Sequence, residues 1–266
     1  MSLRIHNNVE AFNAHRQLSA TGEKLGKSLE RLSSGYRINR ASDDAAGLAI
    51  SERLRGQVKG LAQSKRNVGD AISMVQTAEG SLNEVHSMLQ RVRELAVQYG
   101  NGALSTTDKA AIQSEVNQLA SDIERIGTNT EFNGTKLLNT SGTVTFQVGA
   151  KDGQTITAGT ISLGAQMATN TFTLGGANDL SEIDASINNV SAARANFGVV
   201  QNRLEYAGND ISTYQENLMA AESRIRDVDM ASEMAQMTKY NILQQAGVSM
   251  LAQANQSPQA VLSLLK

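Results

Sequence analysis

The sequence predicts a mainly α-helical fold: an elongated antiparallel helical bundle or coiled coil with a small β-hairpin region. Apolar residues recur every seven positions over long stretches in both halves of the chain, which is typical of helices that pack on one another. Only 4% of the residues are aromatic, so the apolar content is mostly Ala, Leu, Val, Ile and Met, which suit helix bundles. A central segment rich in Thr, Gly and Asn interrupts this pattern and contains the candidate strands.

Three predicted helices occupy the first half of the chain. The first is indicated by apolar residues at helical spacing that include Leu18, Leu25 and Leu32. The second contains two parallel seven-residue rows, and the third has apolar residues alternately four and three positions apart. The rows of the second helix are Val75, Leu82, Leu89, Ala96 and Ala78, Val85, Val92, Tyr99.

Acidic residues mark where these helices should begin. Asp43 and Asp44 directly precede an apolar run, so we interpret them as a helix cap rather than as a catalytic carboxylate pair. Ser105 with Asp108 predicts a capping box at the start of the third helix.

The centre and the second half of the chain predict strands followed by two more helices. Short alternating runs at Val144–Val148, Ile161–Leu163 and Phe172–Leu174 indicate two or three strands. Ser181 with Asp184 predicts a capping box, and heptads continue over Ile183–Val228. A last helix contains clustered methionines, whose helical spacing favours packing over a promiscuous binding groove.

The two ends of the chain should lie together as one bundle, because long helices bury little surface alone. The segment Tyr240 to Leu265 carries no charge on any face, although a helix facing solvent normally has a charged side. Burial between copies of the same chain would supply the several neighbours that such a helix needs. Its many amide side chains and Pro258 would be costly in hydrocarbon, so we do not expect a membrane span.

Composition and motifs argue against most chemical functions. The chain has no cysteine, so disulfides, thiolate catalysis and cysteine-ligated metals are excluded. Its net charge of −2 offers no overall field for nucleic acid or acidic lipid. Its 3 histidines are far apart, and no phosphate-binding, dinucleotide-binding, zinc-protease or nucleophile-elbow motif occurs. We therefore expect no catalytic residue, no metal and no cofactor, and no cleavable secretion signal is visible at the start.

Five segments closely resemble bacterial flagellins, and they occur in the same order as in that family. The longest, Leu32–Ser51, resembles the N-terminal signature of flagellins. The other four segments are Gln90–Gln98, Glu131–Leu138, Phe146–Gly149 with Asp152–Gly153, and Ala252–Lys266. This resemblance covers nearly the whole chain.

The resemblance implies a structural subunit, not an enzyme, that polymerises into the extracellular flagellar filament for swimming. It implies secretion by flagellar type III export, and as partners further copies of the chain, an export chaperone, and the cap and hook–filament junction proteins. Residues 1–44 with 226–266 would form an inner coiled coil that lines a channel and polymerises. Residues 45–225 would form an outer helical bundle with a short β region near 139–180, and the variable outer domains would be missing.

Two groups of residues are candidate interaction sites. By resemblance, Arg91, Leu95 and Glu115 would contact the vertebrate Toll-like receptor for flagellin, with Arg91 and Leu95 on one helix face. The alternative is that the charges are solvated and Leu95 flanks the core. The residues expected to form the subunit-assembly core are Leu18, Leu25, Leu32, Met234, Met237, Leu243 and Met250.

Three other identities compete with that of a filament subunit. A hook–filament junction protein shares end segments with flagellins but caps the polymer, and the unbroken match through residues 90–153 argues against it. A flagellin with an inserted protease would need a metal-binding motif, which the sequence lacks. A generic coiled-coil scaffold would explain the heptads but not the five segments.

Overall fold

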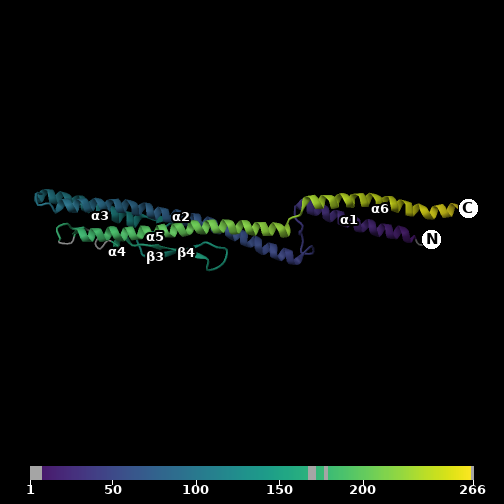
Figure 1. Cartoon of the computed structure of the whole chain (residues 1–266), viewed down its shortest axis with the longest axis horizontal. Coiled ribbons are helices and arrows are strands. Elements are labelled where there is room, and N and C mark those ends of the chain that lie inside the picture. The colour runs from purple at the N-terminus through teal and green to yellow at the C-terminus, as the bar shows by residue number, and fades with distance from the viewer. Residues whose placement is uncertain (1–7, 167–171, 177–178, 265–266) are drawn as a thin grey trace. The chain divides into compact units, whose positions relative to one another are not determined.

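The computed structural model describes residues 8–166, 172–176 and 179–264, and most of these are helical (Figure 1). The prediction of a mainly α protein with small hairpins is confirmed. The elements in chain order are α1 (Val9–Ser34), α2 (Ala45–Tyr99), α3 (Thr106–Asn129), β1 (Glu131–Phe132), β2 (Thr135–Lys136), β3 (Gly142–Gln147), β4 (Thr155–Thr160), α4 (Leu163–Gln166), α5 (Asp179–Arg226) and α6 (Met230–Leu264).

The chain divides into two compact units, each of which combines segments far apart in the sequence. One unit contains residues 1–56 with 218–266, and the other contains residues 57–217. The first of these units includes the first turns of α2 and the last turns of α5 together with the terminal helices. Within it, Arg226 and Glu52 form an ion pair in which the Nη1 and Oε1 atoms are 2.7 Å apart. The functional division into residues 1–44 with 226–266 and residues 45–225 stays a prediction.

The unit of residues 57–217 is a helical bundle built by α2, α3 and α5. The heptad rows of α2 are its core: Val75, Leu82 and Leu89 have no exposed surface. Val116 of α3 and Leu204 of α5 are equally buried. Complete burial of such side chains contributes about 1.5–3 kcal/mol each, which makes this core the main source of stability in the unit.

Caps begin the helices of this bundle largely as the sequence predicts. Ser105 and Asp108 form the expected capping box of α3, in which each side chain accepts a hydrogen bond from the other residue's backbone N–H. The prediction of a capping box at Ser181 and Asp184 is wrong. Helix α5 begins two residues earlier at Asp179, whose carboxylate accepts hydrogen bonds from the backbone N–H groups of the two glycines that precede it, Gly175 and Gly176.

Two antiparallel hairpins connect α3 with the second half of the bundle. Strands β3 and β4 pair from Gly142 opposite Thr160 to Gln147 opposite Thr155, which confirms the first expected strand. The hairpin of β1 and β2 was not predicted, because strands of two residues show no alternation. Its turn is Asn133–Gly134, a dipeptide typical of tight hairpins.

The other two expected strands are absent from the part of the chain that is described. Leu163 opens the short helix α4 instead of ending a strand. Near Phe172 and Leu174 the side chain of Gln113 takes the place of a neighbouring strand. Its amide donates to the carbonyl of Phe172 and accepts from the backbone N–H of Leu174, each at 2.7 Å. These backbone groups are thus satisfied without a sheet.

Candidate self-assembly surface

Helices α1 and α6 lie side by side and form the terminal pair (Figure 1). They run antiparallel, because Asn8 at the start of α1 donates a 2.7 Å hydrogen bond to the carbonyl of Ala254 near the end of α6. Arg31 near the end of α1 faces Glu233 near the start of α6, at 3.6 Å. The sequence prediction that the two chain ends pack together is confirmed.

The contact between these helices follows heptad spacing and is tight near its middle. A Cβ added at Gly247 would lie 3.2 Å from a methyl group of Leu18, so this glycine makes room for the leucine. The half-buried or buried positions on α1 that repeat along the contact are Ala11, Ala14, Leu18, Thr21, Leu25, Ser28 and Leu32. Those on α6 are Glu233, Met237, Tyr240, Gln244, Gly247, Leu251 and Ala254. We call these two rows the seam.

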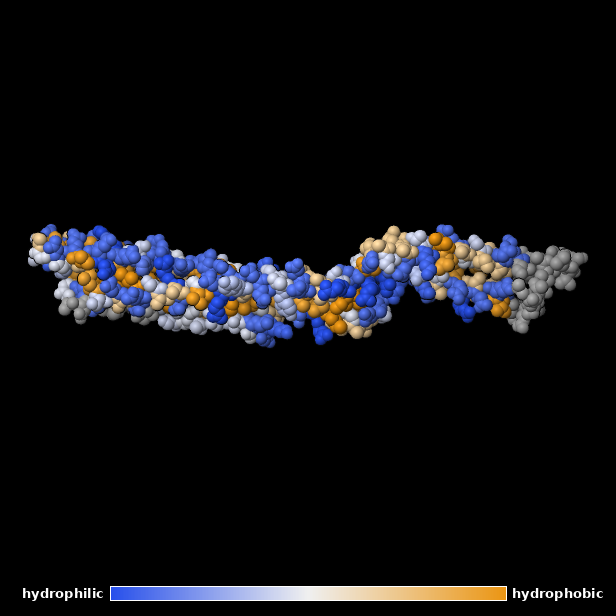
Figure 2. Space-filling view, viewed as in Figure 1, coloured by the Kyte–Doolittle hydropathy of each residue, from blue (hydrophilic) through white to orange (hydrophobic). Residues whose placement is uncertain are grey.

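Large apolar side chains that lie outside the seam are exposed on both helices. On α6 they include Ile242, 61% exposed, and Met250, 64% exposed, and on α1 Phe12 is 74% exposed. Figure 2 shows hydrophobic surface interspersed along this pair rather than confined to one stripe. Isolated exposed apolar residues are ordinary, whereas several on two adjoining helices make this pair the candidate interaction surface.

The seven residues expected to form the assembly core fall into two groups. Leu18, Leu25, Leu32 and Met237 are half-buried in the seam, so within one chain they already contact the partner helix. Met234, Leu243 and Met250 are exposed and remain available for another molecule.

Sequence reasoning missed several exposed apolar residues of the terminal pair. They are Val9, Phe12, Ile242 and Val248. Apolar residues at positions outside the heptad rows were the signal that could have identified them, and Phe12 is one of only 5 phenylalanines in the chain.

A compact crossover joins the ends of four helices within the same unit. The backbone N–H of Arg37 donates to the carbonyl of Arg226 at 2.7 Å, and that of Val228 donates to the carbonyl of Gly35 at 3.0 Å. The guanidinium of Arg226 lies 4.8 Å from the centre of the Tyr36 ring. These contacts tie the α1–α2 connection to the α5–α6 connection.

The loop before α2 is held by two neighbouring aspartates. Lys27 Nζ donates to Asp43 at 2.7 Å, and the backbone N–H groups of Asn39 and Arg40 donate to the same carboxylate. The Lys27 hydrogen bond, followed by those backbone donors, lowers the pKa of Asp43 to about 2. Asp44 accepts from the backbone N–H of Gly47 and thereby caps α2, which confirms the predicted helix cap for Asp44, whereas Asp43 holds the preceding loop.

The residues expected to contact a receptor lie in the unit of residues 57–217. Arg91 of α2 and Glu115 of α3 are exposed and form an ion pair at 3.0 Å. Hydrogen bonds from Arg91 to Glu115 and then Glu94 raise the pKa of Arg91 above its usual value. Leu95, in contrast, is only 2% exposed. The expectation that Arg91 and Leu95 share an accessible face is therefore wrong for Leu95, because the bundle buries a wider stripe of α2 than two heptad rows.

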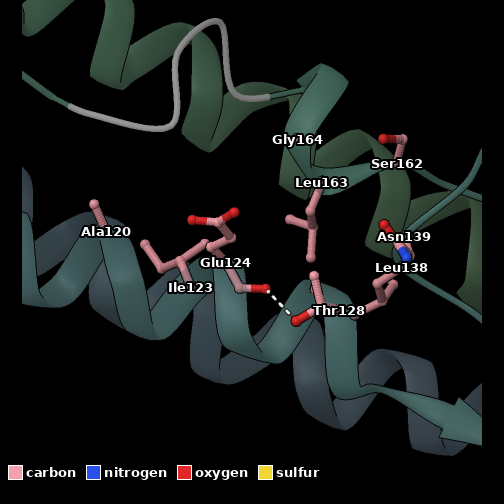
Figure 3. Close-up of a pocket in the computed structure, with 10 residues that line it drawn as sticks. Ala120, Ile123, Glu124, Thr128, Leu138, Asn139, Ser162, Leu163 and Gly164 are labelled. Carbon is pink, nitrogen blue, oxygen red and sulfur yellow. Dashed lines mark hydrogen bonds between the residues drawn. The ribbon is translucent and has the colours of Figure 1, made fainter.

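A small cavity lies between α3, α4 and the segment that follows β2 (Figure 3). Its volume is about 140 Å³, below the roughly 300–1,000 Å³ of sites for small molecules. Leu138, Leu163 and Ile123 supply much of its lining, and the Thr128 hydroxyl donates to the Glu124 carbonyl of its own helix. Across the described ranges, no three His, Asp or Glu side chains are grouped to hold a metal ion, and no helix is long and apolar enough to cross a membrane.

Comparisons with known proteins agree along almost the whole chain. Residues 5–143 match the family model described as the bacterial flagellin N-terminal helical region, and residues 180–265 match the C-terminal helical region. A flagellin of Halalkalibacterium halodurans is 50% identical, with 98% of this chain and 99% of the relative covered. A flagellin of Bacillus subtilis is 45% identical over 99% of this chain and 100% of its own. A flagellar filament 33 kDa core protein of Treponema phagedenis is 44% identical over 98% and 99%.

Proposed function

Since this chain belongs to the bacterial flagellin family and is a structural subunit of the flagellar filament, we propose that it polymerises through the exposed apolar residues of its terminal pair. The observation that carries this proposal is the exposure of Phe12, Ile242 and Met250 beside an already formed seam. A hook–filament junction protein is not favoured, because both family models and the curated relatives are flagellins.

We infer that the terminal pair forms the inner part of the filament and lines its channel. A helical polymer needs heterologous contacts on several sides of each subunit. Apolar residues around both helices would serve such contacts, whereas the charged surface of the α2, α3 and α5 bundle suits an outer, solvated position. We infer further that the chain is secreted and that its filament is extracellular, as expected for a member of this family.

The same surface supports the proposed partners. Before assembly, exposed residues such as Ile242 and Val248 need cover, which is the task of an export chaperone. At the two ends of the polymer one side of the terminal pair has no neighbouring subunit, and cap and hook–filament junction proteins would occupy it.

Recognition by the vertebrate Toll-like receptor for flagellin is a further part of the proposal. Arg91 and Glu115 offer the receptor an exposed pair of opposite charges on adjoining helices. Leu95 would act by packing beneath this surface and would keep Arg91 in place.

Removal of residues 230–266 tests the assembly surface. The truncated chain should remain a partly helical monomer that cannot extend filament seeds, whereas normal filaments from it would refute the proposal.

A finer variant replaces Ile242, Val248 and Met250 by Gln and leaves the seam intact. Loss of about 1.5–3 kcal/mol per buried apolar side chain should raise the critical concentration for growth well over tenfold, as measured by sedimentation.

A matched control replaces polar residues that are exposed on the same helix. Gln236→Ala with Gln245→Ala should change the critical concentration little. Equal growth by the apolar variant and by this control would exclude α6 as the assembly surface.

A further inference from the structure

We propose that Asn101 is a site of spontaneous deamidation, the conversion of its side-chain amide to a carboxylate through a cyclic succinimide. In this reaction the backbone nitrogen of Gly102 attacks Cγ of Asn101 and forms a new C–N bond. The bond between Cγ and the amide nitrogen breaks, and ammonia leaves with the proton lost by Gly102. Water then opens the ring at either carbonyl and yields aspartate or isoaspartate. The reaction consumes one water, needs no oxidant or cofactor, and does not depend on the proposed function.

The loop between α2 and α3 holds Asn101 in a favourable arrangement. The backbone N–H of Ala103 donates a 3.1 Å hydrogen bond to Oδ1 of Asn101. This turn encloses the nitrogen of Gly102, the attacking atom, next to the side chain that it attacks. Oδ1 is also the oxygen that gains negative charge during the attack, so the Ala103 N–H stabilises that charge.

The residues around the attacking nitrogen are exposed to solvent. Asn101, Gly102 and Ala103 are all exposed. A Cβ placed at Gly102 would meet nothing within 4 Å, so neighbouring groups leave space around this residue. Water can therefore reach the succinimide once it has formed.

The chain contains a second Asn–Gly dipeptide in a very different setting. Asn133 has φ 49° and Gly134 has φ 79°, and together they form the turn between β1 and β2. Pairing of Phe132 with Thr135 holds this turn from both sides. To let Gly134 attack, Asn133 would have to leave the left-handed conformation that the hairpin requires. The same dipeptide should thus react slowly here.

The product changes the end of α2. One deamidation alters the net charge from −2 to −3, and isoaspartate also adds a methylene group to the backbone of the loop. The last turn of α2 contains no basic residue that could offset a negative charge near the negative end of the helix dipole. We expect the modified loop to hold α2 and α3 less firmly.

Incubation of the purified full chain at mildly alkaline pH, with peptide mass mapping over time, tests the proposal. Asn101 should deamidate about tenfold faster than Asn133, which corresponds to about 1.4 kcal/mol in activation free energy. In strong denaturant the two rates should become similar, because both sites are then unfolded Asn–Gly dipeptides without the turn or the hairpin. A folded-state rate at Asn101 equal to or below that at Asn133 would overturn the proposal.

Gly102→Ala is the matched variant, since its added methyl group has free space and only hinders the attacking nitrogen. It should slow deamidation at Asn101 about tenfold while circular dichroism and the rate at Asn133 stay unchanged. An unchanged rate at Asn101 in this variant would exclude attack by residue 102.

Discussion

The carboxylate of Asp43 makes the stability of the loop before α2 depend on pH. The pKa of Asp43 in the folded state is about 2, below the ordinary 3.8. Folding therefore stabilises the ionised carboxylate relative to the protonated one. The stabilisation is fully present above about pH 4 and is lost as the pH falls from 3.8 through 2.

In the assembled filament, where we expect α1 and its Lys27 to be ordered, Asp43→Asn should therefore lower the thermal midpoint at neutral pH, and the difference from the unmodified filament should shrink towards pH 2. Thermal unfolding followed by circular dichroism at several pH values measures this. Asp152→Asn, in the exposed turn between β3 and β4, is the control and should show no such convergence. A constant difference across the acidic range would mean that the ion pair with Lys27 contributes nothing.

Arg91→Ala should weaken receptor binding by about 1–3 kcal/mol if this residue is an interface anchor. Its ion pairs with Glu115 and Glu94 are exposed, so the stability of the chain should change little. Arg125→Ala removes a similar exposed arginine, paired within its own helix, and should leave binding unchanged. Surface plasmon resonance measures receptor binding by both variants. Equal affinities of the Arg91→Ala and Arg125→Ala variants would exclude Arg91 from the receptor site.

Leu95 cannot be tested for receptor contact by simple truncation. Because it is buried, Leu95→Ala should destabilise the chain by about 2–5 kcal/mol. Chemical denaturation measures this loss, and a reduced affinity in that variant would report unfolding rather than contact. A cost below about 1 kcal/mol would contradict the packing described for α2.

At the scale of elements, the antiparallel seam predicts a specific disulfide. The Cβ of Leu18 lies 3.8 Å from the Cβ that a residue at 247 would have, which is the usual spacing across a disulfide. The chain has no cysteine, so Leu18→Cys with Gly247→Cys would introduce the only thiols. Oxidised filaments should contain this cross-link within each chain, detectable by mobility in denaturing gels.

The neighbouring positions provide a control for that cross-link. Ser19→Cys with Ala246→Cys moves both thiols one residue along, to exposed positions that turn away from the seam. This pair should not cross-link within a chain. Similar yields from both pairs would contradict the described register of α1 against α6.

Sequence patterns predicted the helices well because heptads persist over many turns of each long helix. Their limit is visible at Leu95, which lies outside both rows of α2. A helix that contacts two others buries a broader stripe, and the width of that stripe depends on neighbours that the local sequence does not specify. The strand predicted at Phe172–Leu174 is wrong for a similar reason. The backbone of this segment bonds to the distant side chain of Gln113 instead of to a neighbouring strand.

The assembly surface was predictable only in part. An uncharged α6 indicated that neighbours must cover it, but which residues face α1 depends on the register of the pair. Met237 and Met234 illustrate this, because one is half-buried in the seam and the other is 48% exposed three residues earlier.

At the scale of the whole molecule, the exposed terminal pair predicts a difference between the free subunit and the filament. Two helices that share a narrow seam bury little apolar surface, so they should be largely unfolded before assembly and ordered within it. Limited proteolysis should trim both ends of the monomer and leave the core of α2, α3 and α5. Equal resistance of the ends in monomer and filament would contradict this.

The crossover also bears on how the length of the protein can vary. Its hydrogen bond between Arg37 and Arg226 closes a very long loop of chain, and the entropic cost of closure grows only with the logarithm of loop length. Doubling the chain inside that loop would cost only about 0.6 kcal/mol. Additional sequence entering at an exposed turn, such as the one around Asp152, could therefore fold outside the bundle while both chain ends keep the same closing contacts.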